Sequence, residues 1–469
     1  MDASEREKQR NALLTNGQAV DLSTGKITTT QPAQVRQGRH VDPVAMARGV
    51  NNTTATTRGT SFAAKLLRDA DTASNARAVI QSMLSQPEGG EGWRGLYAVP
   101  PGTGLEAVLS VFNKETNIPL EIPFFSFLHY VSGMLLDKGV KITGPIGEIT
   151  PEMWTVILAP SGAGKTWASS VIEEAAPVKS NFTEAVSGAA FFEAMAARPW
   201  HLWTQDEIAQ KLKQIEDPRS PLGEVKEYLL RTYDNRPIER TSKKDGTQKI
   251  ERPCLGILGL NTHESFKKAL SAESLLDGFA QRFGFVWAER DPSRPFKEFP
   301  LYDKPKILAA CQRAFDIITA TPIHSQYKIG ADGVEAFRTS FSLLSHGFEQ
   351  DESYYRRALF RAFRYAAIYH VILQKDSDRL DAEDIGWGAR AAAIHLTDMG
   401  KILSKNTSDP TKPGQGEMAA TVEKAKRVRA LMERRAQQGK PTTARDVAQG
   451  LSGINTDEAR ALLTLVSNA

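Results

Sequence analysis

The residues with the clearest chemical pattern lie in the run Ala-Pro-Ser-Gly-Ala-Gly-Lys-Thr at positions 159–166. It matches G-x-x-x-x-G-K-[ST] except that Ala159 replaces the first glycine. Glycines let backbone N–H groups approach phosphate oxygens, the lysine can reach the outer phosphates, and the threonine hydroxyl can ligate Mg²⁺. We therefore predict a site for ATP and Mg²⁺. Its candidate residues are Pro160, Ser161, Gly162, Ala163, Gly164, Lys165, Thr166 and Trp167.

Two acidic residues follow a later apolar run. Asp206 and Glu207 come at the end of WHLWTQDE. A carboxylate at a strand end can hold Mg²⁺ together with Thr166, and a second carboxylate can polarise the attacking water. The alternative is an ordinary helix start, where acidic side chains complement the helix dipole. With Lys165 upstream, we interpret Asp206 as a metal ligand and Glu207 as a catalytic residue.

Two further candidates follow along the chain. Asn261 ends the apolar run CLGILGLN and could orient a water molecule against the outermost phosphate, although asparagine is also a common turn former. Arg282 precedes the run FGFVWAE, and an arginine there could neutralise charge on a neighbouring subunit's phosphate. An ion pair with Asp277 or Glu289 is the alternative for Arg282.

A basic hairpin is predicted between these motifs. The runs PIERTS and TQKIER flank Lys-Asp-Gly, which is typical of a tight turn between two strands. Lys243 and Lys244 at the tip, with Arg240 and Lys249 on the strands, suit contacts with DNA phosphates. The alternative is a solvated hairpin whose lysines prevent edge-to-edge aggregation.

The elements that must position these residues alternate in type. The apolar run at 153–160 predicts a strand, and the text from 165 to 176 predicts a helix. Strand, glycine loop and helix in this order indicate an α/β fold. The other predicted strands cover 200–205, 254–261 and 283–289, and the other helices cover 61–85, 105–116, 124–139 and most of 304–404.

The chain divides into segments of different composition. Residues 1–60 are poor in large apolar side chains and predict a flexible arm. The remaining predicted segments are an N-terminal helical segment and linker (61–100), an ATPase core (105–300), a helical lid (301–403), a linker (404–417) and a C-terminal domain (418–469).

Two helical regions carry basic residues. In the lid, SYYRRALFRAFRYAAIYHVI contains Arg361 and Arg364, which could sense a nucleotide or belong to an amphipathic core helix. In the C-terminal domain a basic helix precedes two capping-box patterns, Thr443 with Asp446 and Asn455 with Glu458. That order predicts a helix-turn-helix, a winged-helix-like domain that contacts DNA or docks on a protein.

Composition excludes several classes of protein. The chain has 469 residues, 41% of them hydrophobic, and a formal net charge of +4, so nucleic-acid binding by bulk charge is not indicated. Two cysteines exclude a disulfide framework. The charged N-terminus and the absence of a long apolar run favour a cytoplasmic protein without a membrane partner.

Several of these motifs together resemble a P-loop ATPase family of phages, plasmids and other mobile genetic elements. The resemblance covers roughly residues 119–403 and rests on PFFSFLHYVSG, LAPSGAGKTWASSVIEEAAP, LWTQDEIAQ, YLLRTYDNRPIERTSKK, RPCLGILGLNTHESFKKAL and DGFAQRFGFV. The family is largely uncharacterised and is associated with primases. It implies an ATPase resembling superfamily III (AAA+) replicative helicases. The chain shows no primase-like or zinc-knuckle segment.

The resemblance implies a function and a set of partners. We expect a homo-hexameric DNA helicase of a phage or mobile element, acting in DNA replication in a bacterial cell on single-stranded or forked DNA, with a primase or replisome partner. ATP hydrolysis at subunit interfaces would use Lys165, Asp206, Glu207, Asn261 and, from the neighbour, Arg282. One alternative is an AAA+ remodeller or loader that acts on a protein. The others are an origin-binding protein that uses nucleotide only as a switch, and a RecA-like core.

Overall fold

A computed structural model describes residues 18–20, 27–29, 60–85, 98–182, 184–242, 246–269, 278–345 and 352–407, and parts of 427–463. Contacts divide the chain into two units, residues 1–62 and 63–469. In the first unit, β1 (Gln18–Val20) and β2 (Ile27–Thr29) pair antiparallel. Apart from these strands and the start of the next helix, the predicted flexible arm lies outside the described residues.

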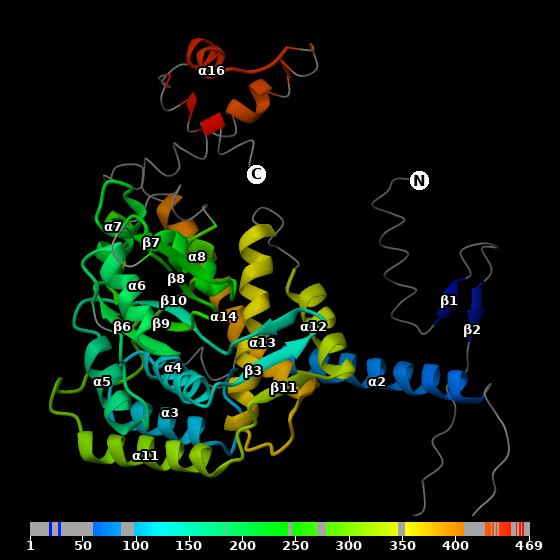
Figure 1. The fold of residues 1–469 in the computed structure, drawn as a ribbon. Helices are drawn as coiled ribbons and strands as arrows, with labels where there is room; N and C mark the ends of the chain where they lie inside the picture. Colours follow the sequence, from blue (N-terminus) through cyan, green and yellow to red (C-terminus); the bar gives the residue numbers. More distant parts are fainter. Residues whose placement is uncertain are drawn as a thin grey trace, which may run out of the picture. The chain divides into compact units, whose positions relative to one another are not determined.

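A parallel sheet forms the centre of the second unit (Figure 1). Its strand order is β10-β5-β9-β6, and each neighbouring pair runs parallel. The strands are β5 (Trp154–Leu158), β6 (His201–Asp206), β9 (Leu255–Asn261) and β10 (Gly284–Trp287). All four match predicted strands, and the α/β class is confirmed.

Helices cover both faces of this sheet because its strands are apolar on both sides. On β5, Val156 and Leu158 belong to one buried cluster and Ile157 to the other. The Ile157 cluster includes side chains of α3 (Gly104–Glu115), α4 (Glu121–Asp137), α5 (Lys165–Ala175) and α11 (Lys304–Ala320). The other cluster includes α6 (Gly188–Ala196), α7 (Ile208–Glu216), α8 (Val225–Tyr233) and Phe266 of α9 (His263–Ala269). The predicted helices at 105–116, 124–139 and 165–176 are confirmed.

A second sheet was not predicted from the sequence. Its strand order is β12-β11-β3-β4, and β11 pairs parallel with both β3 and β12. The strands are β3 (Lys141–Gly144), β4 (Gly147–Ile149), β11 (Gln326–Ile329) and β12 (Arg379–Leu380). Two to four residues are too few for a period-2 pattern to stand out. This sheet joins a segment before the first sheet to the segment predicted as a helical lid.

The predicted lid is also attached directly to the first sheet. It contains α12 (Ala331–Leu344), α13 (Glu352–Ile372) and α14 (Ala382–Thr407). His395 Nδ1 hydrogen-bonds to the carbonyl of Phe285 at 3.0 Å, and the Trp287 N–H donates to Asp398 at 2.8 Å. Both bonds join α14 to β10, so α14 packs against the outer strand of the parallel sheet.

The two ends of the second unit carry helices that were predicted. The helix predicted at 61–85 is confirmed as α2 (Thr60–Ser85), which receives a 2.8 Å bond from Arg390 at the Met83 carbonyl. Near the C-terminus, α16 (Ala444–Gly450) has Thr443 as its N-cap, with the predicted capping box. No helix among the described residues has the length and apolar content needed to cross a membrane.

Candidate functional site

Most of the predicted site residues meet at the edge of the parallel sheet where its strands end. Parallel strands end at a common edge, where ligands bind in many open α/β sheets. Leu158 lies opposite Asn261, and Asp206 lies opposite Leu260. The 159–164 loop, which follows β5, therefore lies at the same edge as Asp206 and Asn261.

The 159–164 loop has the backbone that its glycines predict. Gly162 and Gly164 adopt φ values of 73° and 78°, in the left-handed region that favours glycine. A Cβ on Gly164 would lie 2.8 Å from Ile118 Cδ1, whereas one on Gly162 would meet open space. Gly164 is also the N-cap of α5 and offers no side-chain cap. The first N–H groups of α5 therefore remain available to an anion.

Lys165 lies at the start of α5 with its side chain folded over the loop. Its Nζ donates hydrogen bonds to the carbonyl oxygens of Ala159 at 3.3 Å and Pro160 at 3.1 Å. Burial lowers the pKa of Lys165, while the nearby Asp206 and Glu207 carboxylates partly oppose that shift. A poorly hydrated ammonium group interacts strongly with an arriving anion.

Thr166 and Asp206 bring two oxygen atoms together. Thr166 Oγ1 donates a 2.7 Å hydrogen bond to Asp206 Oδ2, and both residues are exposed. Mg²⁺ usually binds one or two protein oxygens and completes its shell with water and substrate phosphates. The pair fits that requirement. Within the described part of the chain, no group of three or more His, Cys, Asp or Glu side chains could hold a metal ion.

Glu207 has an unusual backbone conformation. Its φ is 51°, in the left-handed region, and it caps α7 while its own N–H donates to Asp206 Oδ1 at 3.0 Å. A non-glycine residue in this region costs roughly 1–2 kcal/mol, and such residues concentrate at functional sites. The side chain is exposed beside Asp206. Its position is compatible with the predicted contact with a water molecule.

Asn261 reaches the same edge, but its side chain is fully buried and engaged. Its Oδ1 accepts a 3.2 Å hydrogen bond from the Ala209 N–H, and its Nδ2 donates to the Thr262 carbonyl at 3.1 Å. The bond with Ala209 attaches the end of β9 to the first turn of α7. Asn261 thus holds the helix that follows Glu207, and contact with a water molecule stays a prediction.

One residue at this edge was missed in the sequence. His263 follows Asn261 closely, and its Nε2 hydrogen-bonds to the Leu158 carbonyl at 3.0 Å. Its ring stacks on Trp287 with centroids 3.7 Å apart and an interplanar angle of 13°. His263 therefore connects the ends of β5, β9 and β10. Its position two residues after Asn261, at the end of a predicted strand, was the sequence signal that could have identified it.

Arg282 lies at the opposite edge of the sheet, where the parallel strands begin. Gly284 pairs with Thr155 near the start of β5, and Arg282 precedes it in a short 3₁₀ helix (Ala280–Arg282). The guanidinium donates to Asp234 at 2.7 Å and to the Gly278 carbonyl at 2.6 Å. The partner is thus Asp234; Asp277, one expected alternative, lies outside the described residues. At this edge Arg282 cannot reach the 159–164 loop of its own chain.

The lid arginines also lie at the edge where the strands begin. Arg364 is 2% exposed, forms an ion pair with Glu152 immediately before β5, and donates to the Tyr233 carbonyl at 2.8 Å. Arg361 is also buried and donates to the Gln281 carbonyl at 2.8 Å. The interpretation of Arg361 or Arg364 as a nucleotide contact within one chain is therefore wrong, because both are buried where the strands begin. The alternative, an amphipathic helix whose aromatic side chains pack in the core, is confirmed.

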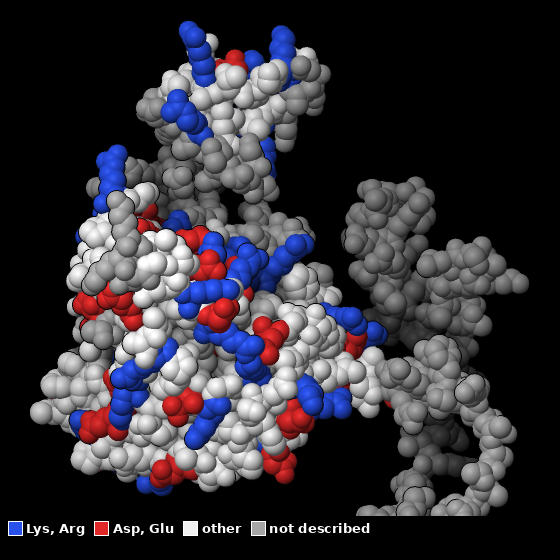
Figure 2. Space-filling view, in the orientation of Figure 1, with Lys and Arg blue, Asp and Glu red and all other residues white. Residues whose placement is uncertain are grey.

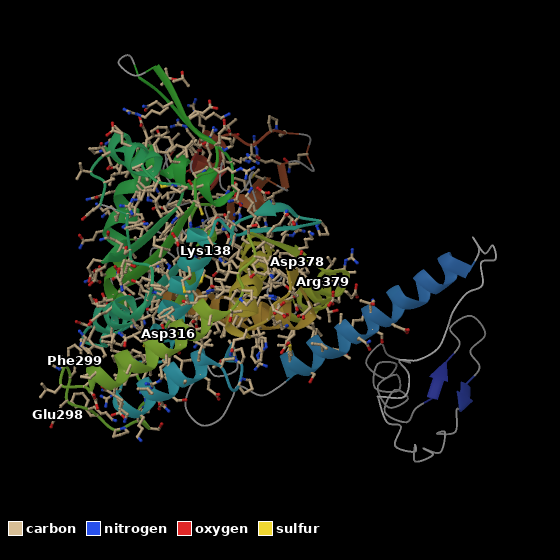
Figure 3. All side chains as sticks on the ribbon, turned by 60° about the horizontal axis from the view of Figure 1, so that its bottom comes forward. Lys138, Glu298, Phe299, Asp316, Asp378 and Arg379 are labelled. Carbon is tan, nitrogen blue, oxygen red and sulfur yellow. The ribbon has the colours of Figure 1, made fainter. Side chains whose placement is uncertain are left out.

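The predicted basic hairpin is present as β7 (Ile238–Ser242) and β8 (Gly246–Ile250), which pair antiparallel. The two strands project from the body of the second unit (Figure 3). Figure 2 shows Lys and Arg side chains interleaved with Asp and Glu over the region where Figure 1 draws these strands. Lys243 and Lys244, the predicted tip residues, lie outside the described part of the chain.

The two described DNA candidates on the hairpin have different surroundings. Lys249 is paired with Glu239 at 3.6 Å and Glu251 at 3.0 Å. These carboxylates raise the pKa of Lys249, with Glu251 contributing most. Arg240 lies opposite the neutral Gln248 on the neighbouring strand. Arg240 therefore keeps more of its charge available to a phosphate than Lys249 does.

The C-terminal prediction is tested only in part. The Thr443 side chain accepts from the Asp446 N–H at 3.3 Å, and Asp446 accepts from the Thr443 N–H at 2.8 Å, as a capping box requires. Asn455 and Glu458 lie outside the described residues. The helix-turn-helix stays a prediction.

Comparison with known proteins gives no family. No model of a protein family matches this chain, and no curated protein matches its sequence.

Proposed function

We propose that the protein is a Mg²⁺-dependent ATPase with an AAA+-type P-loop core that drives movement on DNA. The observation that carries this proposal is the edge where Lys165, Thr166 and Asp206 meet beside the 159–164 loop. A glycine loop, an uncapped helix start, a desolvated lysine and a threonine–aspartate pair are the groups that bind a nucleoside triphosphate with Mg²⁺.

The roles of the residues follow from their positions. The N–H groups of the loop and of the first turn of α5 would receive phosphate oxygens, and Lys165 would exchange its two carbonyl partners for a phosphate. Thr166 and Asp206 would hold Mg²⁺, which neutralises developing charge on the phosphates. Glu207 would accept a proton from the attacking water. His263 and Asn261 would fix the surrounding strands.

The proposal includes a ring, most simply a homo-hexamer. Arg282 lies at the sheet edge opposite its own Lys165, so Arg282 can serve a phosphate only in a neighbouring copy. Its ion pair with Asp234 would have to open for that contact. The projecting hairpin with Arg240 would then grip single-stranded or forked DNA. Replication of a phage or mobile element in the bacterial cytoplasm, with a primase partner, is the setting that the resemblance favours.

The decisive experiment is the substitution Lys165→Ala. We expect loss of ATP turnover by at least ~10³-fold, because positioning and charge neutralisation supply most of the catalysis in phosphoryl transfer. Circular dichroism and the melting temperature should stay close to those of the wild type. Lys179→Ala is the control, since Lys179 bonds only backbone carbonyls at the end of α5 in the described contacts. Turnover at the wild-type rate in Lys165→Ala would refute the site.

DNA as the client requires a separate measurement. ATP turnover by the wild type should rise with single-stranded DNA, and a fork with a labelled strand should be unwound. Stimulation by a protein with indifference to DNA would favour a remodeller instead. Sequence-specific DNA binding without turnover would favour a nucleotide-switched binder.

A further inference from the structure

An aromatic side chain lies next to the 159–164 loop and is only partly covered. Phe299 belongs to the segment between β10 and α11 and is 47% exposed. Its Cε2 is 3.6 Å from the position of a Cβ on Gly164, and Ile118 approaches the same position to 2.8 Å. Figure 3 labels Phe299 and its neighbour Glu298 at the edge of the molecule. Phe299 thus forms an exposed apolar wall directly beside the loop, whereas Ile118, which is 1% exposed, belongs to the core next to Gly164.

A chain of aromatic rings orients Phe299. The Phe299 ring contacts the Tyr302 ring edge to face, with the ring centroids 5.8 Å apart. Tyr302 contacts Trp167 in the same way, with the ring centroids 5.2 Å apart. Trp167 in turn contacts Phe112 at 6.5 Å. Edge-to-face pairs of this kind are each worth about 0.5–1.5 kcal/mol beyond burial. The side chain of Trp167 is therefore part of the support for Phe299.

Arg294 attaches the Phe299 segment to the end of α3. It donates to the carbonyl oxygens of Thr116 at 2.7 Å and Ile118 at 2.8 Å, and to those of Phe112 and Asn113 at 3.3 Å each. Tyr302 also donates to the side-chain oxygen of Asn117. The Arg294 and Tyr302 side chains thus hold the Phe299 segment against the end of α3.

We propose that this wall binds the base of the nucleoside triphosphate by stacking on the exposed ring of Phe299, with weak discrimination between bases. The proposal rests on the ATPase site proposed above. A base is linked through one ribose to the phosphates, so a nucleotide held in the 159–164 loop places its base near the side chains that border the loop. The wall offers it a ring face, and every base has a π-face. Stacking reads no hydrogen-bonding edge of the base, so it discriminates only weakly between bases.

The test is equilibrium binding of ATP, GTP, CTP, UTP and inorganic tripolyphosphate, each with Mg²⁺, measured by calorimetry. For the wild type we expect ATP and GTP to bind within about fivefold of each other. Phe299→Ala should weaken all four nucleotides by about tenfold, equivalent to about 1.4 kcal/mol. Tripolyphosphate, which has no base, should bind within about twofold of the wild-type value, and Phe299→Trp should restore nucleotide affinity.

A matched control is available on the same segment. Phe296 is 76% exposed, and its described ring contact is with Arg290, so Phe296→Ala should leave all five affinities unchanged. Equal weakening of nucleotides and tripolyphosphate in Phe299→Ala would overturn the inference, because it would indicate a damaged loop. ATP binding more than about a hundredfold tighter than GTP in the wild type would overturn it as well.

The failure of this inference and the failure of the ATPase site can be told apart. If Lys165→Ala abolishes tripolyphosphate binding while Phe299→Ala has no effect on any nucleotide, the phosphate site stands and the base site is wrong. If Lys165→Ala leaves tripolyphosphate and ATP binding unchanged, the phosphate site itself is wrong.

Discussion

Thr166 Oγ1 and Asp206 Oδ2 lie 2.7 Å apart, so the first turn of α5 and the end of β6 are joined side chain to side chain. Asp206 ends β6 and Thr166 lies in the helix that follows β5, and β9 separates these two strands in the sheet. The parallel arrangement brings both to the same edge. This hydrogen bond is the structural basis of the proposed metal site.

Asp206→Asn should separate metal binding from nucleotide binding. An asparagine oxygen can still accept the Thr166 hydrogen bond, but the charge that attracts Mg²⁺ is gone. We expect ATP turnover to fall at least ~100-fold, or about 2.7 kcal/mol, with Mg²⁺-free ATP binding nearly unchanged. Turnover at several Mg²⁺ concentrations measures this. Asp217→Asn, at the other end of α7, is the control. Unaltered Mg²⁺ dependence would exclude Asp206 as a ligand.

Glu207→Gln should stop hydrolysis and preserve binding. The substitution keeps the length of the side chain and the left-handed backbone but removes the base. Turnover should fall by ~10²–10⁴-fold, the usual contribution of a general base, while ATP affinity stays within a few fold. Single-turnover kinetics distinguish the two effects. Glu193→Gln, exposed on α6, should behave as the wild type. Loss of ATP affinity would assign Glu207 to binding.

Arg240→Ala should weaken DNA binding more than Lys249→Ala. Lys249 already interacts with Glu239 and Glu251, whereas Arg240 lies opposite the neutral Gln248. Removal of one side chain that binds a phosphate reduces the slope of log K against log salt by about 0.7 for single strands. Fluorescence anisotropy at several salt concentrations measures that slope. A larger effect from Lys249→Ala would place the DNA on the other face of the hairpin.

ATP binding should take up protons at alkaline pH. Burial lowers the pKa of Lys165, so the free protein loses this proton at a lower pH than an exposed lysine, for which the pKa is about 10.4. Bound phosphate favours the ammonium form and raises the pKa again. Affinity should therefore fall as pH rises through the lowered pKa. Calorimetry in buffers of different ionisation enthalpy detects the proton; Lys165→Arg, which stays charged, should show none.

The ion pair between Arg364 and Glu152 should matter for stability much more than an exposed pair. Both side chains are buried, at 2% and 0% exposure, and Arg364→Ala leaves Glu152 without its partner. We expect a loss of ~3–5 kcal/mol in the free energy of unfolding. Arg231→Ala, which removes an exposed ion pair with Glu227, should cost less than ~1 kcal/mol. Urea denaturation measures both. Equal losses would contradict this account of burial.

The sequence predicted what depends on local pattern. The four parallel strands, the glycine loop, the helix from Lys165 and the Thr443 cap follow from short-range periodicity and residue type. The second sheet could not be predicted in this way, because strands such as β12 are stabilised by partners far along the chain. The positions of Arg282 and Arg364 in the fold could not be predicted from the sequence either. An arginine's partner, Asp234 or Glu152, depends on tertiary packing and not on spacing.

The pairing of β11 with β3 limits how the molecule can move. Tyr327 on β11 lies opposite Ile142 on β3. This hydrogen-bonded ladder attaches the segment that contains α12 to α14 to the chain that leads into the parallel sheet. A swing of these helices over a bound nucleotide would have to break that ladder and the bonds from α14 to β10. In the proposed ring, conformational work driven by hydrolysis would therefore be transmitted between subunits, with each subunit turning as a block.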